Sequence, residues 1–153
     1  MSLPQVTVAP SAARRIQHFD CWVFRDELVG QPPSVANGEA AELIDRHGTF
    51  LAYAWYSAVS HIAARVVSTD RRRPLDRALL AERLTTAIAR RATIQHTNAK
   101  RLVFSEADGL PGLIVDQYAD SLVVQIRAAG LEPWRDTLVA LLKERVHPRG
   151  ILE

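Results

Sequence analysis

The chain has 153 residues, of which 48% are hydrophobic, and its formal net charge is +2. This length and apolar content suit one ordinary domain or two small ones, and they exclude a wholly disordered chain. A single cysteine excludes an internal disulfide and a cysteine-rich zinc site, and no apolar run approaches the roughly 18 residues of a membrane helix. The N-terminus lacks the order of a signal peptide, because its basic pair follows its apolar residues. We therefore expect a soluble, cytoplasmic protein that does not contact a membrane.

The first third of the chain predicts a small β-rich unit with one short helix. Residues 5–9 alternate like a strand, and the Pro-Ser pair after them supplies a stop and an N-cap for a helix over residues 12–18. Residues 22–24, WVF, form a short β-type run in which we expect Trp22 to lie in the core. Residues 29–38 are too rich in Pro and Gly for a helix or a central strand, so we expect a loop.

Three more predictions cover the rest of this β-rich unit and the start of the next unit. Residues 39–57 predict a hairpin that closes at Gly48, and residues 62–68 predict a further strand. A helical pattern then starts at Pro74, which suits the first turn of a helix because its missing N–H does no harm there. Leucines at three- to five-residue spacing extend this pattern to about residue 95.

The hydrophobic period changes again after Lys100. The pattern predicts three short strands and a second helix: residues 101–104, 112–118, 121–128 and 132–146. A last β-type run begins at Ile151, where we expect a strand to find almost nothing to pair with.

The stretch SEADGLPG, residues 105–112, concentrates acids between two of these strands. Its Asp-Gly and Pro-Gly pairs are typical of a chain that reverses direction. Carboxylates in such a segment accept hydrogen bonds from turn N–H groups as readily as they serve in catalysis. We interpret Glu106, Asp108 and the following Asp116 as structural rather than catalytic.

No motif of a catalytic, cofactor or metal site occurs in the sequence. GxGxxG, GxxxxGK[ST], HExxH, CxxC and GxSxG do not appear, and the five histidines include no i, i+4 pair. Cys21 stands beside a β-type run, where a small buried apolar residue is a better interpretation than a nucleophile. We therefore predict no catalytic, cofactor-binding or metal-binding residue in this chain.

The charge is unevenly distributed. Residues 65–101 hold ten Lys or Arg and three acids, a net +7, so the remainder carries −5. Arginine supplies 17 of the 19 basic residues, and its planar guanidinium suits phosphate and stacks on bases. Two interpretations stay open: a nucleic-acid surface, or the solvated face of an arginine-rich helix.

The order of motifs resembles a known family. HFDCWVFRDELVG, NGEAAELIDRHGTFLAYAWYS, SAVSHIAARVVS and RLVFSEADGLPGLIVDQYADSLVVQI follow one another as in the N-terminal half of the bacterial large-subunit (23S) rRNA cytosine-5 methyltransferases, the PUA-containing, S-adenosylmethionine-dependent type. The resemblance covers nearly the whole chain, and its most specific piece is residues 106–120.

The resemblance implies an α+β protein with two domains. Residues 1–70 would be a PUA-like small β-barrel, the RNA-binding module of this family. Residues 74–153 would be a central α+β domain of a helix, hairpin strands and a second helix. The family's methyltransferase domain, with its S-adenosylmethionine site and catalytic cysteines, lies C-terminal to everything in this sequence. We therefore expect a truncated central domain, no cofactor in this chain and no catalysis by it alone.

The function that the resemblance implies is RNA binding, with 23S rRNA as the expected partner. The candidate contacts are the cations, ring side chains and hydroxyls of the first half: Arg14, Arg15, His18, Trp22, Ser57, Ser60, Arg65, Arg71, Arg72 and Arg73. Two alternatives remain open. The chain is a stand-alone PUA-type adaptor that binds RNA or docks a protein, including a second copy through an open C-terminal sheet edge, or it is a non-functional fragment with a poorly folded second half.

Overall fold

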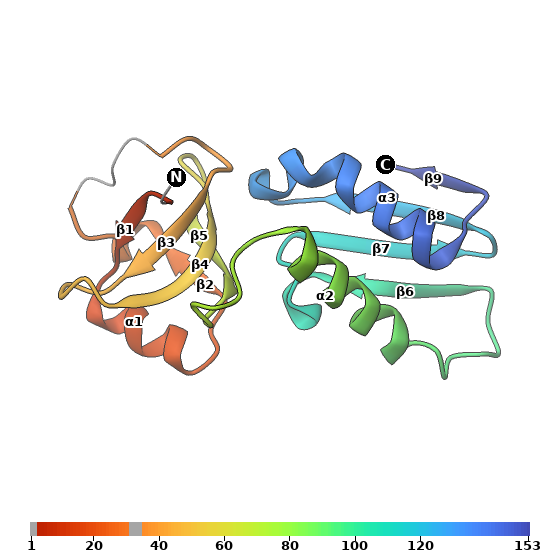
Figure 1. The fold of residues 1–153 in the computed structure, drawn as a ribbon, viewed down its shortest axis with the longest axis horizontal. Helices are drawn as coiled ribbons and strands as arrows, with labels where there is room; N and C mark the ends of the chain where they lie inside the picture. Colours follow the sequence, from red (N-terminus) through yellow and green to blue (C-terminus); the bar gives the residue numbers. More distant parts are fainter. Residues whose placement is uncertain (1–2, 31–34) are drawn as a thin grey trace. The chain divides into compact units, whose positions relative to one another are not determined.

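The computed structural model describes residues 3–30 and 35–153. The chain divides into two compact units, Met1–Leu75 and Asp76–Glu153, and each has its own sheet (Figure 1). Part of the loop predicted over residues 29–38 lies outside the described residues. Among the described helices, none is long and apolar enough to cross a membrane.

The first unit is a curled five-stranded sheet with one α-helix. Its elements are β1 (Gln5–Thr7), α1 (Pro10–Gln17), β2 (Trp22–Phe24), the 3-10 turn η1 (Arg25–Glu27), β3 (Ala40–Ile44), β4 (Phe50–Tyr56) and β5 (Ile62–Ser68). The strand order is β1-β3-β4-β5-β2, with β1 parallel to β3 and the other pairs antiparallel. The predicted hairpin is confirmed as β3–β4. β2 lies at an edge of the sheet, which leaves one of its sides unpaired by a named strand.

The helix of this unit starts earlier than its sequence pattern predicts. Pro10 occupies the first helical position and Ala9 is the N-cap, so the proline begins the helix instead of separating it from the strand. Its fixed φ and missing N–H are both compatible with that position. Ala12, Ala13 and Ile16 of α1 then pack into the core beneath the sheet.

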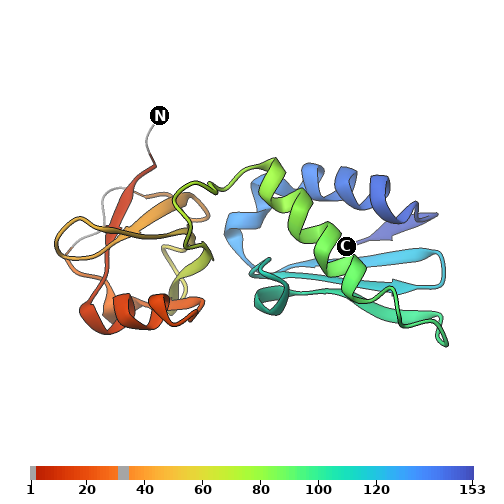
Figure 2. The ribbon, with the colours of Figure 1, turned by 60° about the horizontal axis from the view of Figure 1, so that its bottom comes forward.

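The second unit places two α-helices on one face of a four-stranded sheet. Its elements are α2 (Arg77–Arg90), β6 (Ala99–Phe104), η2 (Ser105–Asp108), β7 (Leu113–Tyr118), β8 (Ser121–Ile126), η3 (Ala129–Trp134), α3 (Arg135–Val146) and β9 (Gly150–Leu152). β6, β7 and β8 are antiparallel, and β9 joins β8 in parallel. Figures 1 and 2 show α2 and α3 on the same side of this sheet. Leu84, Leu113, Leu122, Leu138 and Leu141 are fully buried between the two layers.

Helix α2 is shorter than predicted at both ends. It begins at Arg77, because the Asp76 carboxylate accepts a hydrogen bond from the backbone N–H of Leu79 (2.8 Å) and caps the helix. Pro74 therefore precedes the helix instead of starting it. The helix ends at Arg90, and the residues that follow form turns with short-range hydrogen bonds such as Ile94 N–H to Arg91 O (3.1 Å).

The expectation for the last strand was wrong. Gly150, Ile151 and Leu152 pair with Ser121–Val123 of β8, so the run does find a partner. The local sequence pattern could not predict this pairing, because β8 and β9 are far apart in the sequence. β9 forms one edge of the sheet, and the homodimer expected through that edge stays a prediction.

The acid-rich block between β6 and β7 is a structural connection. η2 ends at Gly109 in the left-handed conformation (φ 69°), and the buried Asp108 side chain accepts a hydrogen bond from Phe104 N–H (2.7 Å). Gly112 also has positive φ (86°), and a Cβ there would lie 2.4 Å from Ala128 Cβ. These contacts support the structural interpretation of the block.

Candidate nucleic-acid interface

A row of rings and guanidinium groups lies on one face of β2 and its neighbours in the first unit. Trp22 and Phe24 are two residues apart on β2 and therefore share a face, with ring centroids 6.4 Å apart. The Phe24 ring lies 5.3 Å from the ring of His61. Arg65 of β5 is directly opposite Trp22 in register, and its guanidinium lies 5.8 Å from the Trp22 ring centroid. We call Arg65, Trp22, Phe24 and His61 the aromatic row.

The expectation that Trp22 lies in the core was wrong. Its side chain is 40% exposed, whereas Val23 between the two rings is completely buried. A three-residue strand at a sheet edge sends alternate side chains to opposite faces, so burying Val23 forces Trp22 and Phe24 outward. An exposed tryptophan next to a cation is a surface on which an unpaired base stacks.

Arg15 links α1 to β2 and to the turn that follows it. Its guanidinium donates hydrogen bonds to the carboxylates of Asp20 (2.7 Å) and Glu27 and to the backbone carbonyl of Trp22 (2.9 Å). It also lies 5.7 Å from the Phe24 ring centroid. The side chain was predicted as an RNA contact, and the structure instead gives it a full set of internal acceptors.

The charges around Arg15 stabilise one another. Hydrogen bonds to Glu27 and then Asp20 raise the pKa of Arg15. Burial opposes the charged form of Asp20, but the hydrogen bond from Arg15 outweighs it and lowers the pKa of that carboxyl. Asp20 and Glu27 are therefore both ionised, and the single positive charge of Arg15 balances only one of the two carboxylates, so this cluster keeps one net negative charge beside the aromatic row.

Arg25 organises the loop that carries Ser57 and Ser60. Its guanidinium donates to the carbonyl oxygens of Ser57 and Ser60 (2.7 Å for the latter) and lies 5.9 Å from the Tyr56 ring centroid. The two serine hydroxyls are engaged as well. Ser57 Oγ donates to Asn37 (3.0 Å) and accepts from Ser60 N–H, and Ser60 Oγ accepts from Ile62 N–H. Both serines, predicted as RNA contacts, shape the turn that leads into His61.

This fold matches a known domain family. Residues 6–69 match the family model described as the PUA-like domain. The first unit carries a PUA-like domain. The whole chain is 31% identical over 152 residues to "Ribosomal RNA large subunit methyltransferase I" of Shewanella amazonensis, and 32% identical over 145 residues to the protein of that name from Shewanella denitrificans. The chain is thus similar, over most of its length, to proteins named as large-subunit ribosomal RNA methyltransferases.

The matches cover almost all of this chain but a minority of each relative. They take in 97% and 90% of the chain, and 38% and 36% of the two Shewanella proteins. Among solved structures, a Streptococcus mutans protein described as a SAM-dependent methyltransferase aligns with a TM-score of 0.80 at 16% identity, over 93% of this chain and 38% of its own. SMU.776, described as a methyltransferase complexed with SAH, aligns with a TM-score of 0.81 at 17% identity, over 98% of this chain and 40% of its own. These structures show the same fold.

The remaining candidate RNA contacts of the PUA-like domain are not members of the aromatic row. Arg14 and His18 are exposed at the end of α1. Arg71 lies 5.0 Å from the Phe50 ring centroid, and Arg72 pairs with Asp70 in the segment after β5. Arg73 is exposed in that same segment.

Two members of the aromatic row, and one arginine that holds the loop beside it, were not predicted from the sequence pattern. Phe24 and His61 are neighbours only because β2 pairs with β5, and Arg25 is recognisable only from the loop that it holds. Cys21 was also misjudged, since it is half-buried rather than buried. The signal that was available is strand alternation around Val23, which predicts that Trp22 and Phe24 share a face.

The basic stretch of residues 65–101 is largely engaged within the protein. Arg90 and Arg91 bind the buried Asp108 carboxylate (3.3 and 2.6 Å), and Arg83 donates to the carbonyl oxygen of Gly109. Arg101 pairs with Asp116. Arg83, Arg90 and Arg91, in α2 and at its C-cap, therefore bind the acid-rich block, an outcome that neither open interpretation of the charge included.

The described residues do not present a fold for S-adenosylmethionine of the doubly wound type. Such a site lies at the carboxyl ends of adjacent parallel strands, above a glycine-rich turn. Among the described residues of the second unit, only β8 and β9 are parallel, and no glycine-rich turn follows β8.

Proposed function

We propose that this chain is the RNA-binding portion of an rRNA (cytosine-5) methyltransferase. In this proposal it positions 23S rRNA, in the cytoplasm, for methyl transfer from S-adenosylmethionine by residues outside this sequence. The relatives' name supports the class of RNA, and the PUA-like domain supports a role in binding it. The cytosine-5 position comes from the motif resemblance.

The aromatic row is the observation that carries the proposal. A tryptophan that is 40% exposed at a sheet edge costs hydration free energy unless a partner covers it. A base covers such a ring by stacking, while Arg65 beside the ring meets the adjacent phosphate. The row therefore suits an unpaired nucleotide next to a phosphate better than it suits an uncharged apolar partner.

The test is the binding of a 23S rRNA fragment to the whole chain, measured by fluorescence anisotropy at two salt concentrations. We expect the logarithm of affinity to fall with that of salt by about 0.7 to 0.9 per phosphate neutralised. Trp22→Leu should lower affinity by about 1–3 kcal/mol at both salt concentrations, because it removes a stacking surface. Arg65→Gln should in addition reduce the salt slope by about one phosphate.

A matched control separates the row from general charge. Arg46 is exposed in the β3–β4 turn, outside the row, so Arg46→Gln makes the same change in net charge. If Arg46→Gln weakens binding as much as Arg65→Gln, the row is not the interface. Absence of any binding at low salt would refute the proposal and favour the adaptor alternative.

A further inference from the structure

The four-stranded sheet of the second unit has one face that its helices do not cover. Residues opposite each other in register share a face, so Ala99 and Tyr118 lie together, as do Arg101 and Asp116. Val103 and Val115, which are opposite each other in register, face α2 and α3 and are completely buried. Tyr118 is 55% exposed on the uncovered face.

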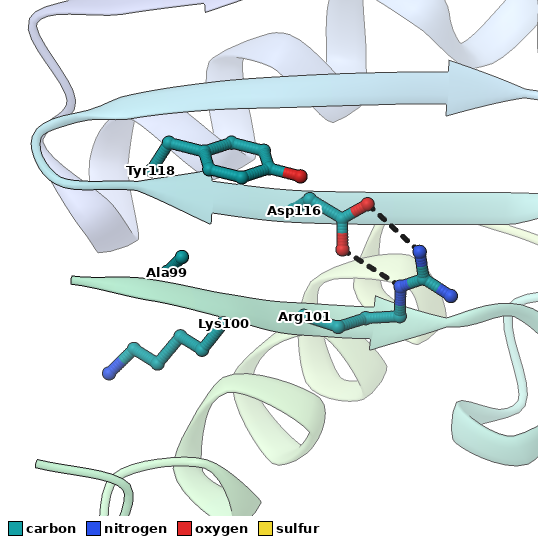
Figure 3. Close-up of a pocket in the computed structure, with 5 residues that line it drawn as sticks. All are labelled: Ala99, Lys100, Arg101, Asp116 and Tyr118. Atoms are coloured by element: carbon teal, nitrogen blue, oxygen red, sulfur yellow. Dashed lines mark hydrogen bonds and ion pairs between the residues drawn. The ribbon is translucent and has the colours of Figure 1, made fainter. Parts of the chain in front are cut away.

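A hollow of about 320 Å³ opens on this face between β6 and β7, lined by Ala99, Lys100, Arg101, Asp116 and Tyr118. Figure 3 shows the Tyr118 ring along β7 and the Lys100 side chain extending from β6, with the small Ala99 between them. Lys100 is opposite Gln117 in register, on the other face, so its side chain borders the hollow from the outer edge of β6. A flat group can therefore approach the ring while an anion approaches the lysine.

The charge of this hollow is positive. Arg101 donates two hydrogen bonds to the Asp116 carboxylate (2.8 and 3.0 Å), a bidentate pair that neutralises the acid. Lys100 forms no ion pair with any residue in the described ranges 3–30 and 35–153. One ammonium charge therefore remains unbalanced beside an exposed aromatic ring.

We propose that this hollow binds one nucleotide of unpaired RNA, with its base stacked on Tyr118 and its phosphate on Lys100. A nucleotide offers a flat base to the ring and a phosphate to the cation, a combination that an apolar protein surface lacks. The guanidinium of Arg101 lies 5.1 Å from the ring centroid of Phe104, which is itself 50% exposed, so the stacking surface continues along β6. This inference rests on the proposed function, because it adds a second RNA contact to the aromatic row.

The test follows backbone amide resonances of the whole chain while an unpaired four-nucleotide RNA is added. We expect saturable shifts at residues 99–101 and 116–118. Tyr118→Leu should raise the Kd at these amides about ten-fold, since a stacked base is lost. Tyr118→Phe keeps the ring and should leave the Kd within two-fold of the original. If Tyr118 acted only through a structural role of its hydroxyl, this variant would not keep that Kd.

The contribution of the Lys100 ammonium group to RNA binding is tested with a matched pair of lysine variants. Lys100→Gln should weaken binding and lower the salt slope by about 0.7, whereas Lys143→Gln, an exposed lysine of α3 on the other layer, should do neither. Thermal unfolding of each variant shows that it is folded.

The other possible outcomes of the resonance experiment would each show that the proposed RNA site on β6 and β7 is wrong. If amides of the aromatic row shift and those of residues 99–101 and 116–118 do not, the inference is wrong and the proposed function stands. If no amide in either unit shifts with RNA, both are wrong. If residues 116–118 shift with protein concentration instead of RNA, the face is a self-association surface and the inference is overturned.

Discussion

Arg14 and Arg15 are adjacent on α1. Within residues 3–30 and 35–153, only Arg15 of the two has internal acceptors, on Asp20, Glu27 and Trp22. Arg15→Gln should therefore destabilise the PUA-like domain by about 1–2 kcal/mol, a value reduced for its partial exposure. Arg14→Gln removes an exposed cation and should leave the unfolding free energy unchanged while weakening RNA binding.

Urea unfolding followed by tryptophan fluorescence measures the first effect, and RNA anisotropy measures the second. The two arginines have the same charge and are one residue apart, so each variant controls for the other. Equal destabilisation by both changes would contradict the structural role of Arg15.

At the scale of elements, the β6–β7 connection depends on Asp108. Burial opposes its charged form, but the hydrogen bonds from Arg91 and Phe104 N–H outweigh burial and lower its pKa from the ordinary 3.8. A lowered pKa contributes stability that is present above the unfolded-state value and lost as pH falls through the folded-state value. Asp108→Asn should cost the second unit about 2 kcal/mol at pH 7, and the difference from the unmutated chain should shrink below about pH 4.

Hydrogen exchange of the β6 and β7 amides at pH 7, with urea unfolding down to pH 3, checks this expectation. Asp120 is the matched control, because it is an exposed carboxylate in the β7–β8 turn whose pair with Arg149 is solvated. Asp120→Asn should have no measurable effect. A pH-independent effect of Asp108→Asn would contradict the ion-pair explanation.

At the scale of the whole molecule, each unit has its own core. The first unit buries a cluster that includes Val8, Ile16 and Leu43, and the second buries the leucines of α2, α3 and the sheet. The domain division is thereby open to a direct test. Fragments 1–75 and 76–153 should each unfold cooperatively in urea, with the small stability typical of domains this size.

Tryptophan fluorescence reports on both fragments, since Trp22 and Trp55 lie in the first and Trp134 in the second. A non-cooperative transition in fragment 76–153 would support the alternative of a poorly folded second half. Cooperative transitions in both would exclude it.

The sequence by itself determined the local elements and the family that the chain resembles. Alternation in the hairpin, the leucine spacing of α2 and the turn pairs around Gly109 and Gly112 are short-range patterns, and they predicted β3–β4, the helix core and the connection. The motif order also predicted the rRNA methyltransferase relatives. Exact helix ends were missed, because the start of α2 depends on one capping hydrogen bond to Asp76 and the start of α1 on Pro10 at its first position.

Only the tertiary structure decided which charged and aromatic groups meet. Arg15 lies 12 residues from Glu27, Arg91 lies 17 from Asp108, and Trp22 meets Arg65 across paired strands. Local periodicity contains no information on such partners, because side-chain contacts over long sequence separations follow from strand pairing and packing. For the same reason an arginine-rich stretch that resembles a binding surface became internal ion pairs. The exposed rings at Trp22 and Tyr118 are the surfaces that the fold leaves for RNA in our proposal.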